Sequence, residues 1–270
     1  MRPKINVIIS TYEYPLALGK ALESLSAQTI PPDEVLIADD GSGPETTEVI
    51  VTHSKRLPLR HVRHGHNGFR KAVILNKALA QSAGDYIVFL DGDSVPARQF
   101  IADHAALAEH GCWVQGRRAF VDESCVATFA PTRIHIWSLA LRGKLSGLLK
   151  AVRLPCPVVK RDREQRGILG CNLGIWRDDL IAVNGYDETF TGWGREDADL
   201  GNRLYHLGRD RKFVYGRAII YHLNHPVVSR DRLQNNQALL EETLRAKRVR
   251  ARQGLDQYLD DQQDAAGISS

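Results

Sequence analysis

The chain has 270 residues and lacks any run that approaches the roughly 20 apolar residues of a membrane-spanning helix. Its first apolar run, Ile5 to Ile9, is too short for a signal peptide and is expected to form a strand. None of the four cysteines belongs to a Cys-x-x-Cys pair, so neither a zinc site nor a disulfide framework is expected. Internal repeats and low-complexity segments are also absent. These absences favour a soluble protein of the reducing cytoplasm.

Acidic residues are scarce in one long segment, although the net charge of the chain is only +4. Between residues 133 and 166, only Asp162 and Glu164 oppose a set of basic residues, which are Arg133, Arg142, Lys144, Lys150, Arg153, Lys160, Arg161, Arg163 and Arg166. Such a stretch can face nucleic acid, an anionic membrane or a diphosphate, or it can be an ordinary solvated surface. No nucleic-acid-binding motif accompanies it, so no nucleic-acid partner is expected. Its amphipathic pattern makes peripheral contact with the inner face of a membrane a hypothesis.

Strand and helix signals alternate through the first half of the chain. Apolar runs predict strands at 4–10, 34–38, 59–63 and 86–90, and helical spacing of apolar residues predicts helices at 16–28, 45–54 and 71–83. This order predicts an α/β fold with a Rossmann-like, mainly parallel mixed sheet flanked by helices on both faces.

The second half has a less regular pattern. It predicts helices at 96–110, 132–153, 178–183 and 197–207, strands at 113–120 and 212–221, and a mobile loop at 155–167. Residues 229–258 predict a polar, arginine-rich helix that extends the domain at its C-terminal side, and residues 260–270 predict a frayed tail.

Two acidic clusters directly follow predicted strands: Asp39-Asp40 and Asp91-Gly92-Asp93. In sheets of this kind, ligands bind beyond the carboxyl ends of the strands. Two carboxylates separated by a glycine can hold one divalent cation and its phosphate ligands, and Mg²⁺ and Mn²⁺ prefer such oxygen atoms. A turn closed by Asp side chains is the alternative for either cluster. The buried strand before Asp91 and Asp93 favours the metal site, whereas Asp39 and Asp40 fit a nucleoside contact and a helix N-cap equally well.

The segment from Gly192 to Leu200 combines glycines, an aromatic ring and acids. Glycines let a ligand approach the backbone closely, and Trp193 offers an apolar face to a sugar ring. A carboxylate at Glu196 or Asp197 can act as general base on a sugar hydroxyl. The alternative is ordinary enrichment of acids in the first turn of a helix, with Trp193 in the core. That alternative does not explain why Gly-Trp-Gly precedes the acids.

Two histidines, His222 and His225, follow a predicted strand. A neutral imidazole at this place can be a further protein ligand of a metal held at Asp93. A single histidine is more often structural, so this interpretation depends on the Asp93 site. His222 is the preferred ligand because it directly follows the strand.

Taken in order, these motifs resemble glycosyltransferase family 2, whose members have the GT-A fold. The N-terminal part of the resemblance rests on residues 7–12, 24–29, 39–42 and 89–93. The C-terminal part is similar to a region shared by chondroitin-polymerase-type enzymes and animal β-1,4-galactosyltransferases, on residues 170–172, 192–199 and 222. The resemblance implies a GT-A domain over residues 1–228, with a nucleotide-binding half (1–95) and an acceptor-binding half (96–228), followed by a C-terminal helical extension and tail (229–270).

The resemblance also implies a role for each matching residue. The nucleotide-sugar would be held by Thr11, Tyr12, Asp39, Asp40, Asp91 and Trp193. A Mn²⁺ or Mg²⁺ ion would be bound by Asp93 and His222. Asp197 would be the catalytic base, and Glu196 would orient the substrate.

The activity implied by the resemblance is an inverting transfer of sugar from a nucleotide-sugar, usually a UDP-sugar. The acceptor would be a saccharide or a lipid-linked saccharide in the synthesis of a bacterial surface polysaccharide or lipopolysaccharide. A sugar nucleotidyltransferase is disfavoured because no N-terminal glycine-rich loop with a following Arg and Lys is present. A non-catalytic nucleotide-sugar-binding protein of the same fold is the other alternative. The joint presence of Asp93, Asp197 and His222 favours the enzyme.

Overall fold

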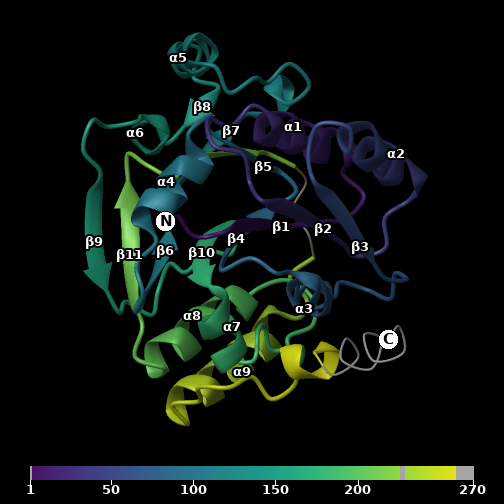
Figure 1. Ribbon diagram of the computed structural model, residues 1–270, viewed down its shortest axis with the longest axis vertical. Helices are drawn as coiled ribbons and strands as arrows, with labels where there is room; N and C mark the ends of the chain where they lie inside the picture. The colour runs from purple at the N-terminus through teal and green to yellow at the C-terminus, as the bar shows by residue number, and fades with distance from the viewer. Residues whose placement is uncertain (1, 226–228, 260–270) are drawn as a thin grey trace.

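An eight-stranded sheet runs through the middle of the molecule in the order β3-β2-β1-β4-β10-β6-β11-β9 (Figure 1). The computed structural model describes residues 2–225 and 229–259, except for the side chains of residues 133 and 134. The strands of this sheet are β1 (Ile5–Thr11), β2 (Glu34–Asp39), β3 (Leu59–Arg63), β4 (Tyr86–Asp91), β6 (Cys112–Gln115), β9 (Val158–Asp162), β10 (Asn172–Trp176) and β11 (Asp210–Tyr215).

The part of the sheet that comes first in the sequence is parallel. β1 pairs with both β2 and β4, in a register that sets Thr11 opposite Asp39 and Ser10 opposite Asp91. The carboxyl ends of these strands therefore meet at one edge. β10 is antiparallel to both β4 and β6, and β9 is antiparallel to β11, which makes the whole sheet mixed. The predicted mainly parallel α/β sheet is confirmed.

Helices cover both faces of the sheet because its central strands are apolar on both sides. Along β1, Val7 and Ile9 belong to one buried cluster and Ile8 to another. α3, α7 and α8 pack on the side of Ile8, and α1, α2 and α4 on the side of Val7 (Figure 1). These helices are α1 (Pro15–Ser26), α2 (Pro44–His53), α3 (Lys71–Gln81), α4 (Phe100–Leu107), α7 (Arg177–Ala182) and α8 (Glu196–His206).

A second, four-stranded sheet has the order β5-β12-β7-β8. Its strands are β5 (Ser94–Pro96), β7 (Arg118–Val121), β8 (Leu145–Ser146) and β12 (Ile220–Leu223), and the nearby helices are η1 (Glu123–Cys125), α5 (Arg133–Leu141) and α6 (Leu148–Ala151). The single strands predicted at 113–120 and 212–221 are wrong, because each is two strands that belong to different sheets. Among the residues that the structure describes, no helix has the length and apolar character needed to cross a membrane.

Two other predictions for the middle of the chain are also wrong. The single helix predicted at 132–153 is broken at Gly143 and Gly147, whose φ angles of 68° and 76° are left-handed and incompatible with a continuous helix. The loop predicted at 155–167 contains β9, which forms the edge of the large sheet by pairing with β11. Val158 and Val159 favour a strand, but the charged residues that follow them in β9 hide this signal in the sequence.

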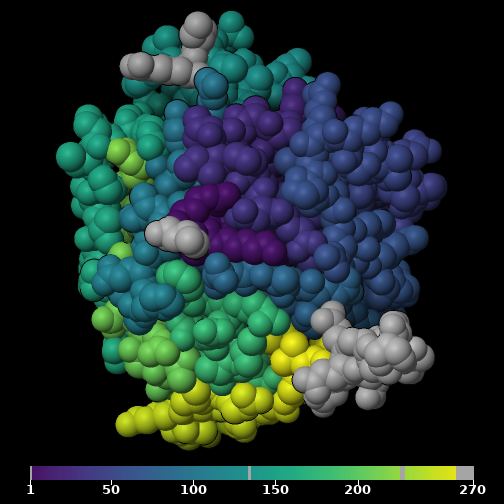
Figure 2. Space-filling model, in the orientation of Figure 1, coloured from purple at the N-terminus to yellow at the C-terminus, as the bar shows by residue number. Residues whose placement is uncertain are grey.

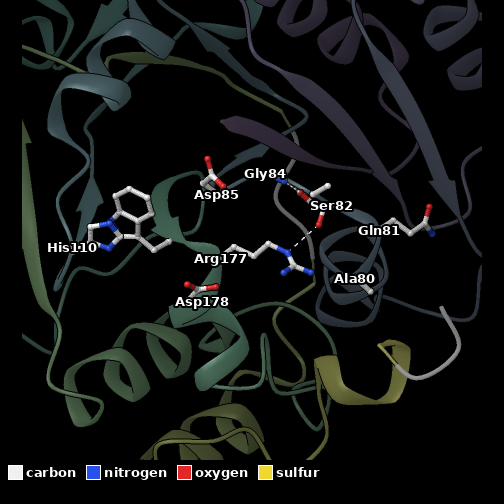
Figure 3. Close-up of a pocket in the computed structure, with 10 residues that line it drawn as sticks. Ala80, Gln81, Ser82, Gly84, Asp85, His110, Arg177 and Asp178 are labelled. Atoms are coloured by element: carbon white, nitrogen blue, oxygen red, sulfur yellow. Dashed lines mark hydrogen bonds between the residues drawn. The ribbon is translucent and has the colours of Figure 1, made fainter. Parts of the chain in front are cut away.

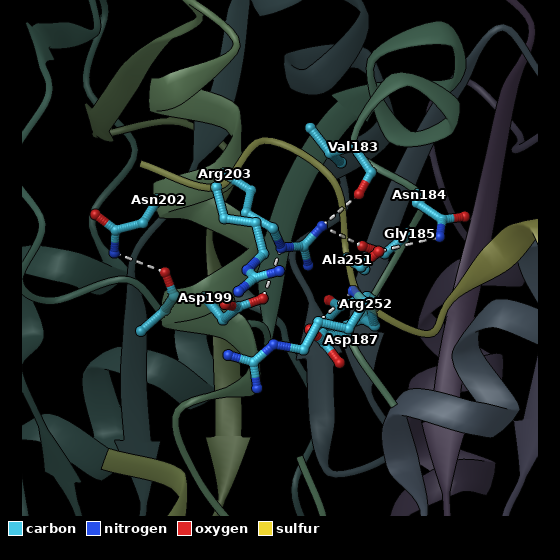
Figure 4. Close-up of polar contacts among 12 residues, drawn as sticks. Val183, Asn184, Gly185, Asp187, Asp199, Asn202, Arg203, Ala251 and Arg252 are labelled. Carbon is cyan, nitrogen blue, oxygen red and sulfur yellow. Dashed lines mark hydrogen bonds and ion pairs between the residues drawn. The ribbon is translucent and has the colours of Figure 1, made fainter. Parts of the chain in front are cut away.

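The C-terminal extension is part of the main fold. It forms α9 (Leu233–Arg245) and η2 (Leu255–Tyr258), and not the single helix predicted at 229–258. Leu255 is buried in the same core cluster as α3. The side-chain amide of Asn184 donates to the carbonyl of Ala251 (Figure 4) and accepts from the backbone N–H of Asp256, and the backbone carbonyls of Val183 and Asn184 accept from the N–H groups of Ala251 and Leu255. The predicted tail at 260–270 lies outside the described residues.

Arg203 of α8 forms a buried ion pair within the helix and also binds the turn after α7, which contacts the C-terminal extension. Arg203 is fully buried and donates to Asp199 Oδ2 at 2.7 Å (Figure 4). Its guanidinium also donates to the carbonyl oxygens of Val183 at 2.6 Å and Gly185 at 2.8 Å. One charged side chain therefore ties α8 to the turn that follows α7.

We predict that Arg203→Ala lowers the free energy of unfolding by about 3–5 kcal/mol, because it leaves a buried carboxylate without its partner. Urea unfolding followed by tryptophan fluorescence measures this change. Arg245→Ala, at an exposed position of α9, is the control and should stay within about 0.5 kcal/mol of the parent. Adding Asp199→Asn to Arg203→Ala should recover part of the loss. A cost for Arg203→Ala no larger than that of the control would contradict the anchoring role.

Candidate active site

The carboxyl ends of β1, β2 and β4 form one polar edge. The hydroxyl of Ser10 donates to Asp91 Oδ1 at 3.1 Å, and Thr11 ends β1 directly opposite Asp39. The Oγ1 atom of Thr11 is buried and has no hydrogen-bond partner among the described residues. A buried hydroxyl without a partner is rare in native structures, and a bound ligand is one explanation for it.

Asp39 is fully buried at this edge, and both of its carboxylate oxygens are bonded within the protein. Oδ1 accepts from the backbone N–H of Ser42 at 2.8 Å, and Oδ2 lies 2.9 Å from His61 Nε2. Burial raises the pKa of Asp39, but the hydrogen bonds from His61 and Ser42 outweigh it and leave the pKa below its usual value. Asp39 is thus an ionised carboxylate that shapes the loop after β2.

Asp40 joins this loop to the start of α3. Its Oδ1 lies 2.5 Å from His64 Nε2, and its Oδ2 accepts from the backbone N–H of Arg70 at 2.8 Å. On the solvent side, the exposed ring of Tyr12 stacks on His66, with ring centroids 4.6 Å apart. The structure thus brings Tyr12 and Asp40, which were predicted to hold a nucleoside, to the same loop cluster. Their contact with a nucleoside stays a prediction.

Asp93 and both candidate histidines converge on one point. His222 Nδ1 lies 2.9 Å from Asp93 Oδ1, and His225 Nε2 lies 2.9 Å from Asp93 Oδ2. One ligand atom from each of the three residues lies within 4.8 Å of the others. His222 Nδ1 is buried, and its approach to Asp93 does not have hydrogen-bond geometry. Two imidazole nitrogens and a carboxylate oxygen form a donor set for one divalent metal ion, in which the carboxylate is a ligand that Mn²⁺ and Mg²⁺ prefer and the imidazoles favour a transition metal.

The geometry does not force a choice between His222 and His225, because both reach Asp93. Burial raises the pKa of Asp93, but the contacts with His222 and His225 outweigh it and hold the pKa well below its usual range. Tyr14, which the sequence reasoning missed, lies edge-on to His225 with ring centroids 6.1 Å apart. Burial and the charge of Asp93 raise the pKa of Tyr14. Tyr14 could have been found from the sequence, because it lies just after β1, where ligands of such sheets bind.

The predicted catalytic pair opens α8. Asp197 Oδ2 accepts from the backbone N–H of Gly170 at 2.8 Å, and its Oδ1 is buried without a hydrogen-bond partner among the described residues. A Cβ at position 170 would overlap the Asp197 carboxylate, so only glycine allows this approach. Burial raises the pKa of Asp197, and burial together with the charge of Asp197 raises the pKa of Glu196 to about 7. A carboxyl group with a raised pKa is suited to accept a proton near neutral pH.

A lysine that the sequence reasoning missed lies among these acids. Lys71 begins α3, and its Nζ lies 2.7 Å from Asp91 Oδ1 with little exposure to solvent. Burial lowers the pKa of Lys71, but the charges of Asp91, Asp197 and Glu196 raise it well above its usual value. The sequence did carry a signal: Arg70 and Lys71 open a helix, where the helix dipole disfavours positive charge.

The loop that carries Trp193 lies against both the start of α3 and the C-terminal extension. The backbone N–H of Gly192 donates to the carbonyl of Phe69 at 3.2 Å. The buried side-chain amide of Asn236 on α9 donates to the carbonyls of Thr191 at 3.1 Å and Gly194 at 2.8 Å. Trp193 is 40% exposed, which rules out the alternative that it belongs to the core.

A separate hollow lies at the opposite ends of the strands, before β4 (Figure 3). Residues 80–85, 110 and 176–178 line it, and His110 stacks on Trp176 with ring centroids 3.8 Å apart. None of the predicted site residues lies there. This hollow therefore supplies positions for control substitutions.

Taken together, the fold and the site define a GT-A protein with a candidate metal-binding turn, a candidate nucleoside-binding edge and a buried acid pair. The comparisons with known proteins agree. Residues 6–156 match the family model described as glycosyl transferase family 2. Residues 151–226 match one described as the N-terminal domain of galactosyltransferase. The chain belongs to glycosyl transferase family 2, and the resemblance inferred from its motifs is confirmed.

Curated relatives share this similarity over most of the chain. It is 28% identical over 225 residues to validoxylamine A glucosyltransferase of Streptomyces hygroscopicus subsp. limoneus, a match that covers 76% of this chain and 49% of the relative. It is 26% identical over 240 residues to chondroitin synthase of Escherichia coli, covering 82% of this chain and 35% of the relative. The chain thus spans about half of one relative and about a third of the other.

Solved structures confirm the GT-A fold. TarS 1-349 of S. aureus, in complex with UDP-GlcNAc, superposes with a TM-score of 0.66 at 17% identity, over 95% of this chain and 70% of that one. The mannosyltransferase PcManGT of Pyrobaculum calidifontis, in complex with GDP-Man and Mn2+, superposes with a TM-score of 0.60 at 20% identity, over 92% and 65%.

If Asp93, His222 and His225 hold one ion, His222→Ala and His225→Ala should each weaken Mn²⁺ binding by roughly tenfold or more, since even residues behind the ligands contribute that much. Isothermal titration calorimetry with Mn²⁺ alone measures the affinity. His110→Ala in the opposite hollow is the matched control and should bind Mn²⁺ as the parent does. Unchanged binding in His225→Ala would leave His222 as the only histidine ligand.

Proposed function

We propose that the protein transfers a sugar from a nucleotide-sugar to an acceptor hydroxyl with inversion of configuration. One observation carries this proposal: the acid pair at the start of α8 lies in the same charged cluster as Asp91, at the end of β4. The residues proposed as the base for the acceptor and as the turn for the donor diphosphate are therefore within electrostatic reach of one another. Membership of glycosyl transferase family 2 supports the same reaction class.

In the proposed mechanism, Asp197 Oδ1 takes the proton of the acceptor hydroxyl as this attacks the donor sugar from the face opposite the diphosphate. This is a single displacement without a covalent enzyme intermediate. The N–H of Gly170 donates to Oδ2, and Oδ1, which has no hydrogen-bond partner among the described residues, would receive the proton. Lys71 opposes the raised pKa of Asp197 and so favours its ionised form. Glu196 orients the acceptor, and the exposed face of Trp193 contacts the donor phosphate and sugar.

The donor is proposed to be a UDP-sugar held with Mn²⁺ or Mg²⁺. Asp93, His222 and His225 would hold the ion, which neutralises charge on the leaving diphosphate when bound. Asp39 and Asp40 order the loop on which the nucleoside would lie. The stacked rings of Tyr12 and His66 would form one side of the nucleoside site. The UDP-GlcNAc named for the TarS complex and the Mn2+ named for the PcManGT complex support this choice.

The acceptor is proposed to be a saccharide or a lipid-linked saccharide in bacterial surface polysaccharide synthesis. The chondroitin synthase relative supports a growing glycan as acceptor. We place the reaction in the cytoplasm, with peripheral contact at the inner face of the membrane. The basic segment from 133 to 166 is the observation that favours this contact.

Asp197→Asn should lower kcat by on the order of 10²–10⁴-fold, because a general base contributes that much. Donor binding should stay nearly unchanged, since the amide keeps the size of the side chain. Gly170→Ala should also lower kcat, because it displaces the same carboxylate without removing it. Release of UDP from the donor with a working acceptor measures kcat, and calorimetry measures donor affinity.

Asp178→Asn, at an exposed acid of the opposite hollow, is the matched control and should leave both quantities unchanged. A large loss of donor affinity in Asp197→Asn would contradict the assignment, because Asp197 would then be a donor-binding residue.

A further inference from the structure

The segment between Glu123 and Asp162 contains no acidic residue, but it contains seven basic ones, which are Arg133, Arg142, Lys144, Lys150, Arg153, Lys160 and Arg161. We call the part of it formed by α5, β8 and α6 the outer lobe. α5 lies at the extremity seen at the top of Figures 1 and 2, and α6 lies below it at the upper left edge of Figure 1. Lys144 pairs with Asp122 at 3.1 Å. Arg142 and Lys150 have no carboxylate partner in the part of the chain that the structure describes.

The outer lobe also exposes large apolar side chains. Leu141 and Leu149 are each 87% exposed, and Trp137 is 44% exposed. Trp137 and Leu141 are four residues apart on α5, so they share one face of that helix. The opposite face, with Ile136 and Leu139, is buried against the second sheet. α5 therefore presents apolar side chains on two sides, only one of which is covered.

The outer lobe is joined directly to the strand that carries a candidate metal ligand. His222 of β12 pairs with Phe120 of β7, and Phe120 pairs with Ser146 of β8. Tyr221, next to His222, belongs to the same buried cluster as Ile136. A surface that holds this lobe would therefore hold the site at a fixed distance.

We propose that the outer lobe docks on an anionic phospholipid bilayer. Trp137, Leu141 and Leu149 enter the headgroup region, and Arg142 and Lys150 contact lipid phosphates. Exposed apolar side chains flanked by unpaired cations are the pattern that binds anionic bilayer surfaces, which attract Lys and Arg near the headgroups. The role of this contact rests on the proposed function, because docking would bring the active site to a lipid-linked acceptor. Docking itself can be measured without turnover.

The test is co-sedimentation of the full chain with vesicles of phosphatidylcholine containing about one-third phosphatidylglycerol. The parent protein should bind at low salt and be released at about 1 M salt, where charges are screened within about 3 Å. Leu141→Ser with Leu149→Ser should lower the partition coefficient by about tenfold or more, because two exposed leucines are lost. Val51→Ser, which removes an apolar side chain that is 59% exposed on α2, is the matched control and should bind like the parent.

Thermal stabilisation by UDP and Mn²⁺ should be the same in all three proteins, which shows that the variants are folded. If the parent shows no such stabilisation but binds vesicles as expected, the proposed function fails and the docking surface stands. Absence of vesicle binding at low salt would overturn the proposal. So would equal binding to pure phosphatidylcholine, or a loss of self-association in the double variant without any effect on vesicles.

Discussion

Pairing of β10 with β4 is the constraint on which the rest of the site depends. β10 lies antiparallel between β4 and β6, so the two halves predicted from the sequence share one continuous sheet. Asn172 pairs with Leu90, which places Gly170 and Cys171 beside the end of β4. The N–H of Gly170 then fixes Asp197. A shift of this register would separate the carboxylate of the proposed base from the donor turn.

The second requirement is charge balance in a buried space. Asp91, Glu196 and Asp197 gather around the ammonium group of Lys71, and Arg118 lowers the pKa of Asp197 further. Burial raises the pKa values of Glu196 and Asp197, and the positive charge of Lys71 opposes this rise. The C-terminal extension stabilises the loop that carries Trp193, because the side chain of Asn236 donates to the backbone carbonyls of Thr191 and Gly194.

The sequence predicted the alternating first half well, because buried strands and amphipathic helices leave strong periodic signals. It also predicted that Asp93 would meet a histidine, and that Asp91 and Asp39 would each lie at the carboxyl end of a strand. It failed where one predicted strand is in fact two strands in different sheets, as with β6 and β7 or β11 and β12. It also missed β9, because the charged residues of this edge strand hide its strand signal. Lys71 was missed because its importance depends on acids more than a hundred residues later in the chain, Glu196 and Asp197. The basic residues at the start of α3 were a local signal, but the pairing with these acids follows only from the fold.

Thermal unfolding with a panel of nucleotides and nucleotide-sugars, with Mn²⁺ and with EDTA, tests the central claim most directly. A ligand that binds only the native state must raise the unfolding midpoint. A metal-bound nucleotide-sugar site predicts a rise with UDP and with one UDP-sugar that EDTA abolishes. A folded sample whose midpoint no nucleotide raises, with or without metal, would contradict it.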